Sequence, residues 1–139
     1  MYLKEVSALY DADPIKNTMD AGRLLQRQFA DADREYFVSV NLDAQGRPIS
    51  YHIAGIGSVT TVHFPVASVF KVALLQNAVS VLICHNHPGG NRTPSNEDCN
   101  ATKELVAAGK LIGIRVLDHI ILTPVDYLSL RAERGDLFE

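Results

Sequence analysis

The residues best suited to chemistry are two histidines and a carboxylate in the second half of the chain. His85 and His87 are separated by one residue and follow a short apolar run at 79–84. Side chains at i and i+2 of a strand point the same way, so the two imidazoles can form two corners of a tetrahedral metal site. Asp98 lies a short way downstream, where it can face back as a third ligand. Two histidines, one carboxylate and an open fourth position are typical of a catalytic zinc site.

The start of the next helix decides where Asp98 is placed. A Gly- and Pro-rich loop follows the histidines and turns the chain back. In one arrangement Thr93 caps the helix and Pro94 is its first residue. In the other, Ser95 caps the helix and Asp98 is its third residue. Both arrangements put Asp98 in the first turn, facing the histidines.

These residues also have ordinary structural interpretations. A His-x-His pair in a small protein is commonly a pair of polar loop residues, and Asp98 is also a carboxylate favoured by the helix dipole. The letters His-Asn-His at 85–87 do not match the separated positions of HNH nucleases. The sequence contains no zinc-deaminase signature, phosphate-binding Gly-Lys loop or His-Glu-x-x-His helix. The combination of strand end, loop and helical carboxylate is what favours a metal site.

Strands and helices alternate around this segment. Strands are predicted at 2–10, 35–42, 48–54, 59–63, 79–84 and 114–122, and helices from 17, from 65 and across 101–112. A turn at 43–46 joins two of the strands into a hairpin, and Gly109 or Gly113 ends the last helix. The tail from 126 is expected to fray. The sequence therefore predicts an α/β (α+β) fold, a mixed sheet with helices packed on it.

Composition and charge narrow the class of protein. The chain has 139 residues, of which 47% are hydrophobic, and a net charge of −3, which favours one globular domain and argues against nucleic acid as a partner. No apolar run approaches the roughly 18 residues of a membrane span, and the N-terminus lacks the layout of a signal peptide. We therefore expect a cytoplasmic protein with no membrane partner. Cys84 and Cys99 fit reduced, packed thiols.

The spacing of the central segment resembles the JAMM motif of the JAB/MPN metalloprotease superfamily. The motif reads His-x-His-Pro, six residues, Ser, two residues, Asp, and its positions are filled by His85, His87, Pro88, Ser95 and Asp98. The runs HNHPGGNRTPSNED and GKLIGIRVLDHIIL are similar to the RadC family in particular, and the similarity covers about residues 17 to 125. The resemblance implies a JAB/MPN fold, a mixed, curved sheet flanked by helices and similar to that of cytidine deaminase.

The same resemblance implies a division of the chain and a short form of the family. Residues 1–16 are expected to be an N-terminal extension with an edge strand, and 17–139 a RadC-like JAB/MPN domain. Full-length RadC proteins also carry a helix-hairpin-helix region, which residues 1–16 cannot supply. The chain departs from the usual RadC pattern at 88–92, where the changes affect access to the metal and no ligand. Around 61–70 the match needs a one-residue shift, so His63 inherits no role.

The resemblance also implies metal-assisted hydrolysis. One Zn²⁺ per chain is expected on His85, His87 and Asp98, lowering the pKa of a bound water toward about 7; Mn or Fe suits the same ligands. Glu35 stands where the family has its upstream glutamate and is the expected general base. Without the resemblance, it is more simply a surface carboxylate at a strand edge. Ser95 is expected to hold the oxyanion, and a capping role does not exclude this.

The implied substrate is a peptide or a ubiquitin-like protein, cleaved by a zinc-dependent peptidase or isopeptidase. One alternative is a DNA-repair or DNA-processing role of RadC type, which the acidic charge and the missing helix-hairpin-helix region disfavour. Another is a non-catalytic interaction domain, which the complete ligand set disfavours. The oligomeric state and the identity of the substrate are left open.

Three further residues near the motif are given structural roles. His119 is expected on the same strand face as Leu117 and Ile121, as a core or edge histidine. Asp118 is expected on the other face, together with Ile114, Val116 and Ile120. A buried carboxylate there needs partners and could support the metal ligands. Cys84 is expected to point away from the metal.

Overall fold

Ten short elements make up most of the chain that the computed structural model describes, which is residues 15–16, 18–29, 32–57 and 66–139. In chain order they are α2 (Thr18–Phe29), β1 (Tyr36–Leu42), β2 (Pro48–Ile56), α3 (Val66–Leu75), β3 (Ser80–Asn86), α4 (Asn96–Ile112), β4 (Arg115–Leu122), β5 (Tyr127–Ser129), α5 (Leu130–Glu133) and the 3₁₀ helix η1 (Gly135–Phe138). The strands predicted at 2–10 and 59–63 lie outside the described residues. They stay predictions, as does the domain boundary at residue 16.

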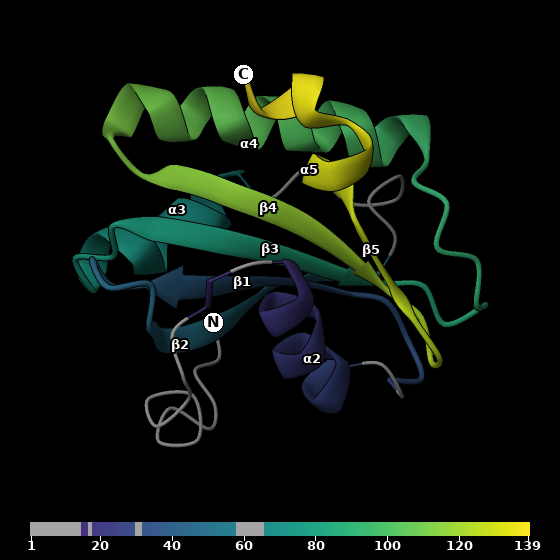
Figure 1. The fold of residues 1–139 in the computed structure, drawn as a ribbon. Helices are drawn as coiled ribbons and strands as arrows, with labels where there is room; N and C mark the ends of the chain where they lie inside the picture. The colour runs from purple at the N-terminus through teal and green to yellow at the C-terminus, as the bar shows by residue number, and fades with distance from the viewer. Residues whose placement is uncertain (1–14, 17, 30–31, 58–65) are drawn as a thin grey trace.

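The strands form one mixed sheet in the order β2-β1-β3-β4-β5 (Figure 1). β1 and β2 are a hairpin, and Asp43 Oδ1 closes its turn by accepting the backbone N–H groups of Gln45 and Arg47. β1 and β3 are antiparallel, as are β4 and β5, whereas β3 and β4 are parallel. Parallel neighbours need a crossover connection, which α4 provides. The predicted mixed sheet flanked by helices is confirmed.

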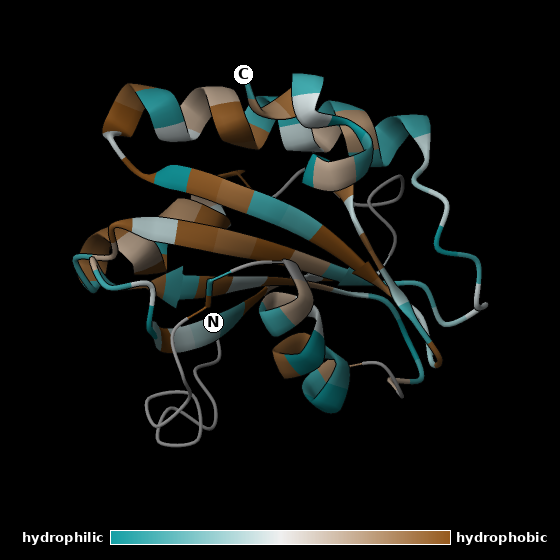
Figure 2. Cartoon of the chain, in the orientation of Figure 1, coloured by the Kyte–Doolittle hydropathy of each residue, from teal (hydrophilic) through white to brown (hydrophobic). Residues whose placement is uncertain are grey.

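Helices cover both faces of the sheet, because successive side chains of each strand point to opposite faces. Val38 packs with Leu25 of α2 on one face. Phe37 packs with Phe70 of α3 and Leu105 of α4 on the other. β3 lies at the centre, is largely brown in Figure 2, and has all seven of its residues buried. The prediction of a central strand covered on both faces is therefore confirmed.

α4 runs from the candidate site to the far end of the sheet and ends at Gly113. This residue has φ 81°, a left-handed conformation that favours glycine, and its N–H reaches the carbonyl of Gly109. Gly109 has a different role: a Cβ there would meet the carbonyl oxygen of Ile114 at 2.3 Å. Of the two predicted stops, Gly113 ends the helix, and Gly109 lets it pack closely on the start of β4.

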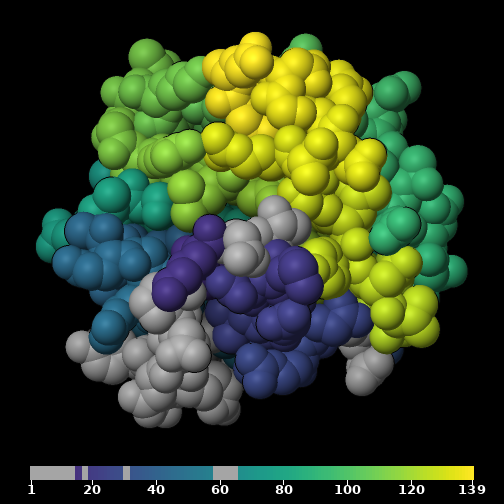
Figure 3. All heavy atoms as spheres, in the orientation of Figure 1, coloured from purple at the N-terminus to yellow at the C-terminus, as the bar shows by residue number. Residues whose placement is uncertain are grey.

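The C-terminal segment folds into β5, α5 and η1, so the expectation that it frays from 126 is wrong. Leu130 and Leu137 anchor it, with exposed fractions of 0% and 3%. α5 contacts β4, and η1 contacts α4. Figure 3 shows this segment in yellow, covering part of the green α4 region. The large apolar residues of this segment are Tyr127, Leu128, Leu130, Leu137 and Phe138, two groups that are too short to establish a helical or strand period.

β4 is irregular in the middle, and this changes which way its residues face. Relative to β3, it carries one extra residue between Val116 and His119. Ile114 and Val116 pack on the α3 and α4 face, whereas Ile120 packs on the α2 face. The expectation that Ile114, Val116 and Ile120 share one face with Asp118 is therefore wrong, because a bulge breaks strict alternation.

Candidate metal centre

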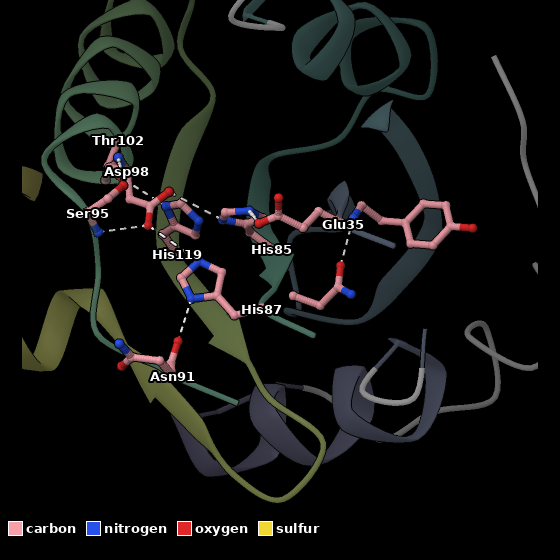
Figure 4. Close-up of polar contacts among 10 residues, drawn as sticks. Glu35, His85, His87, Asn91, Ser95, Asp98, Thr102 and His119 are labelled. Atoms are coloured by element: carbon pink, nitrogen blue, oxygen red, sulfur yellow. Dashed lines mark hydrogen bonds and ion pairs between the residues drawn. The ribbon is translucent and has the colours of Figure 1, made fainter. Parts of the chain in front are cut away.

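Four of the predicted site residues meet at the carboxyl end of β3 (Figure 4). His85 is the last residue but one of β3, His87 is the first residue after that strand, and Asp98 lies in the first turn of α4. Glu35 immediately precedes β1, whose Phe37 pairs with His85. Strand pairing therefore brings Glu35 to one side of the histidines, and the connection from β3 to α4 brings Asp98 to the other.

The two carboxylates flank the pair of histidines. Nε2 of His85 lies 3.2 Å from Oε1 of Glu35, and Nδ1 of His85 lies 3.3 Å from Oδ1 of Asp98. Nε2 of His87 lies 3.6 Å from Oδ2 of Asp98. The side chain of Asp98 is 2% exposed and that of Glu35 is 28% exposed. One carboxylate is thus enclosed, and the other opens to solvent.

The tautomer of His87 follows from its second ring nitrogen. Nδ1 lies 2.7 Å from the carbonyl oxygen of Asn91. A carbonyl only accepts, so Nδ1 carries the proton and donates it. The lone pair is then on Nε2, the nitrogen that faces Asp98. A backbone carbonyl that orients an imidazole in this way is a common support for a metal-ligating histidine.

Ser95 fixes both the start of α4 and the direction of Asp98. Its Oγ accepts the backbone N–H of Asp98 at 3.0 Å, and Oδ2 of Asp98 accepts the backbone N–H of Ser95 at 2.9 Å. This reciprocal pair is a capping box. Of the two predicted caps, Ser95 is therefore the one used. Accepting a bond uses a lone pair of the hydroxyl and leaves its proton as a donor.

Asp98 is held as a carboxylate. Burial by itself raises its pKa, but contacts with His85 and His87 and the N–H of Ser95 outweigh burial and keep the pKa well below its ordinary range. The Asp98 carboxylate in turn raises the pKa of His87, an effect that burial partly offsets. A proton and a metal ion therefore compete for His87, because a ligating imidazole must be neutral.

The side chains present fit a metal ion. Glu35, His85 and His87 each offer a ligand atom within 4.8 Å of the others. Imidazole nitrogens and carboxylate oxygens suit zinc and several other divalent metals. Nδ1 of His85 is buried, and Oδ1 of Asp98 lies 3.3 Å from it without completing a hydrogen bond. Asp98 is not part of this group of three; it contacts Nδ1 of His85 and Nε2 of His87 from the other side.

A comparison with protein-family models finds one family whose match spans every residue of the candidate metal centre. The family model described as a RadC-like JAB domain matches residues 15–135. The chain belongs to the RadC-like JAB domain family. Its match includes all the residues of the candidate metal centre and confirms the resemblance that the central motif carries.

Proteins named UPF0758 are relatives of this RadC-like JAB domain. The one from Chloroflexus aggregans is 39% identical over 133 residues, which are 96% of this chain and 58% of that protein. The one from Methanosarcina mazei is 36% identical over 119 residues, 86% of this chain and 52% of the relative. The one from Syntrophomonas wolfei is 41% identical over 100 residues, 72% and 43% of the two chains. The chain thus spans about half the length of these relatives.

His119 lies beside the candidate metal centre of this RadC-like JAB domain, with its ring centroid 6.1 Å from that of His85. The hydroxyl of Thr102 donates to the carbonyl of Asp98 at 2.8 Å, so its oxygen accepts from Nδ1 of His119 at 2.7 Å. Nε2 is then unprotonated, and it has no hydrogen-bond partner among the described residues. Burial lowers the pKa of His119 to about 3, which keeps the ring neutral.

The sequence predicts a core or edge histidine at His119 but not the groups that surround its ring. The ring is fully buried, as expected, but the bulge in β4 turns it toward α4 and His85. A histidine in an apolar strand gave no sign of this. The irregular pairing of β3 with β4 places the ring there. Pairing between segments that are distant in sequence cannot be predicted from a local sequence pattern.

An open cleft lies over the exposed side of the centre. It is lined by Arg34, Glu35, His87, Gly89, Asn91 and Thr93, and so brings together the segment before β1 and the loop between β3 and α4. Arg92 ties this loop to the start of β5, since its Nη1 donates to the carbonyl of Tyr127 at 3.2 Å. A molecule in the cleft would meet Glu35 and His87 before the enclosed Asp98.

The remaining candidates lie away from the centre. His52 is buried on β2 and its Nε2 lies 3.1 Å from Oγ of Ser68, while His63 is outside the described residues. Asp118 binds the C-terminal segment, and its Oδ1 also accepts the backbone N–H of His119 at 2.7 Å. Cys84 packs on the α2 face, away from the histidines as predicted, and burial raises the pKa of its thiol. Both cysteines are free thiols.

Proposed function

We propose that this RadC-like JAB domain is a zinc-dependent hydrolase that cleaves an amide bond. The observation that carries the proposal is the pair of histidines with a carboxylate on each side, one enclosed and one open to a cleft. An acceptor held beside a metal and facing solvent is what the activation of water requires. The family match and the ligand spacing support a metal at this place.

Asp98 and Glu35 have different proposed roles. Asp98 is the proposed third ligand beside His85 and His87, because it is ionised, buried and held by the N–H of Ser95. A bound zinc supplies Lewis acidity, which polarises a carbonyl and makes water easier to deprotonate. Glu35 is the proposed general base, because its side chain is partly exposed and lines the cleft. It takes a proton from the attacking water and returns it to the leaving amine.

Ser95 has a proposed second role besides its cap. Its oxygen accepts from Asp98, so the hydroxyl proton stays available to an oxyanion that forms next to the metal. We propose a peptide or ubiquitin-like protein as the substrate class, because the cleft is open on the surface and an extended chain can lie across it. Hydrolysis of a peptide bond or an isopeptide bond uses the same groups.

Substitution of the proposed base tests this function. Glu35→Gln keeps the size of the side chain and removes the proton acceptor, so cleavage of any peptide or isopeptide found in a screen should fall by roughly 100-fold or more. Zinc content should stay that of the wild type. Glu104→Gln, the same change on the exposed surface of α4, is the matched control. A Glu35→Gln variant that cleaves at the wild-type rate would contradict the assignment.

A further inference from the structure

Asn86, the residue between the two histidines, makes two hydrogen bonds to the segment that carries Glu35. Its Oδ1 accepts the backbone N–H of Tyr36 at 2.7 Å, and its Nδ2 donates to the carbonyl of Arg34 at 2.8 Å. The side chain is only 1% exposed. Both polar ends of the amide are therefore used, and both are used on a segment 50 residues or more away in sequence.

The two backbone groups belong to the peptide units on either side of Glu35. The carbonyl of Arg34 precedes its Cα, and the N–H of Tyr36 follows it, so one side chain restrains both dihedral angles of Glu35. The carbonyl of Glu35 itself accepts the N–H of Gly57 at 2.8 Å. Glu35 lies just before β1 begins. Asn86 thus supplies contacts where the regular ladder of β1 and β3 has ended.

We infer that Asn86 is a positioning residue for Glu35, and this inference rests on the proposed function. The strand that presents His85 and His87 on one side also holds the backbone of the proposed base on the other. Asn86, placed between the two histidines, thereby restrains the backbone that puts Oε1 of Glu35 at 3.2 Å from Nε2 of His85. Asn86 touches neither water nor substrate in this role; it acts through Glu35.

Geometry gives the reason for an asparagine at this place. The site needs one donor and one acceptor on the same short side chain, which an amide has. A carboxylate offers no donor to the carbonyl of Arg34, and a hydroxyl is too short to bridge both groups. Replacement by alanine or threonine leaves at least one of these buried backbone groups unpaired, and the segment should then shift toward solvent.

The test follows the ring nitrogens of His85 by NMR in the full chain after treatment with chelator. Glu35→Gln should displace these resonances, because it changes the group in contact with Nε2. Asn86→Ala should displace them too, and the double variant should add nothing further, as expected of two residues acting in series. Exchange of the Tyr36 amide should become about tenfold faster when its bond to Asn86 is lost.

Two further variants keep the test decisive. Asn86→Thr fills the strand position with a residue suited to a strand, so it is informative if Asn86→Ala does not fold. Asn41→Ala is the matched control, because Asn41 is a fully buried asparagine of the same sheet that bonds to Ser50 at 3.2 Å. It should lower stability and leave the His85 resonances unchanged.

The outcomes separate this inference from the proposed function. Wild-type His85 resonances in Asn86→Ala and Asn86→Thr, or an effect that adds to that of Glu35→Gln, would overturn the positioning role. Titration with Zn²⁺ is a separate measurement on the same samples. Failure of the wild type to bind Zn²⁺ counts against the hydrolase, while the His85 resonances still decide whether Asn86 positions Glu35.

Discussion

At the scale of single residues, the centre is built from side chains that each do two things. Asp98 is the third residue of α4 and forms a capping box with Ser95. The same carboxylate contacts both histidines. Ser95 begins the helix and fixes the direction of that carboxylate. The signal that starts α4 and the placement of a proposed ligand are therefore one arrangement.

Ser95→Ala should weaken the fold and the metal site together. Loss of the cap costs about 1 kcal/mol of unfolding free energy. The freed first turn should also weaken zinc binding by roughly tenfold, as loss of a group that supports a ligand commonly does. Urea unfolding and zinc titration measure the two effects. Ser95→Thr, which keeps a capping hydroxyl, should restore most of both; unchanged zinc affinity in Ser95→Ala would separate the cap from the site.

His119 should give the stability of the fold a measurable dependence on pH. Its pKa is lowered to about 3 in the folded chain, from an ordinary value of 6.5. Between pH 6.5 and 3 His119 is protonated in the unfolded chain and neutral in the folded chain. The contribution of His119 to the unfolding free energy is therefore complete above pH 6.5 and is lost as the pH falls toward 3. The loss is up to about 1.4 kcal/mol per pH unit.

Urea unfolding of the wild type and of His119→Gln at pH 7, 6 and 5, with chelator present, measures this contribution. The difference in unfolding free energy between the two proteins should shrink as the pH falls. His87 acts in the opposite direction because its pKa is raised, but it is common to both proteins and cancels in the difference. A difference that stays constant from pH 7 to 5 would mean that His119 titrates normally.

At the scale of elements, the central strands and the long helix could be predicted, because their signals are local. Residues 35–42 and 79–84 carry runs typical of strands, and the loop and cap before α4 mark where it begins. What could not be predicted depends on contacts between distant segments. The bulge that turns His119, the bonds from Asn86 to the Glu35 segment and the anchoring of the C-terminal segment all arise when strands pair.

Asp118 should hold the C-terminal segment on the sheet. It accepts the hydroxyl of Ser129 at 2.5 Å and the backbone N–H of Arg131 at 3.0 Å. Asp118→Ala leaves these donors without the carboxylate, at a cost of about 1 to 3 kcal/mol. Limited proteolysis should then cut residues 127–139 several times faster than in the wild type. Asp136→Ala, which removes an exposed carboxylate from the same segment, is the control; equal cutting of the two variants would contradict the role.

At the scale of the whole molecule, the apolar core and the candidate metal centre occupy different parts of the sheet. Buried side chains pack on both faces, and the ionisable residues of the centre gather where β3 ends and α4 begins. In the parts that the structure describes, no helix is both long and apolar enough to cross a membrane. We propose that this end of the molecule holds one metal ion beside a general base.

Metal content tests this claim most directly. Protein purified without a metal-affinity step should contain close to one zinc per chain by mass spectrometry, and Asp98→Ala should lose it while Asp136→Ala keeps it. The predicted ratio rests on the two histidines and the enclosed carboxylate. A folded wild type that contains no zinc, and takes up none when zinc is added, would contradict the account.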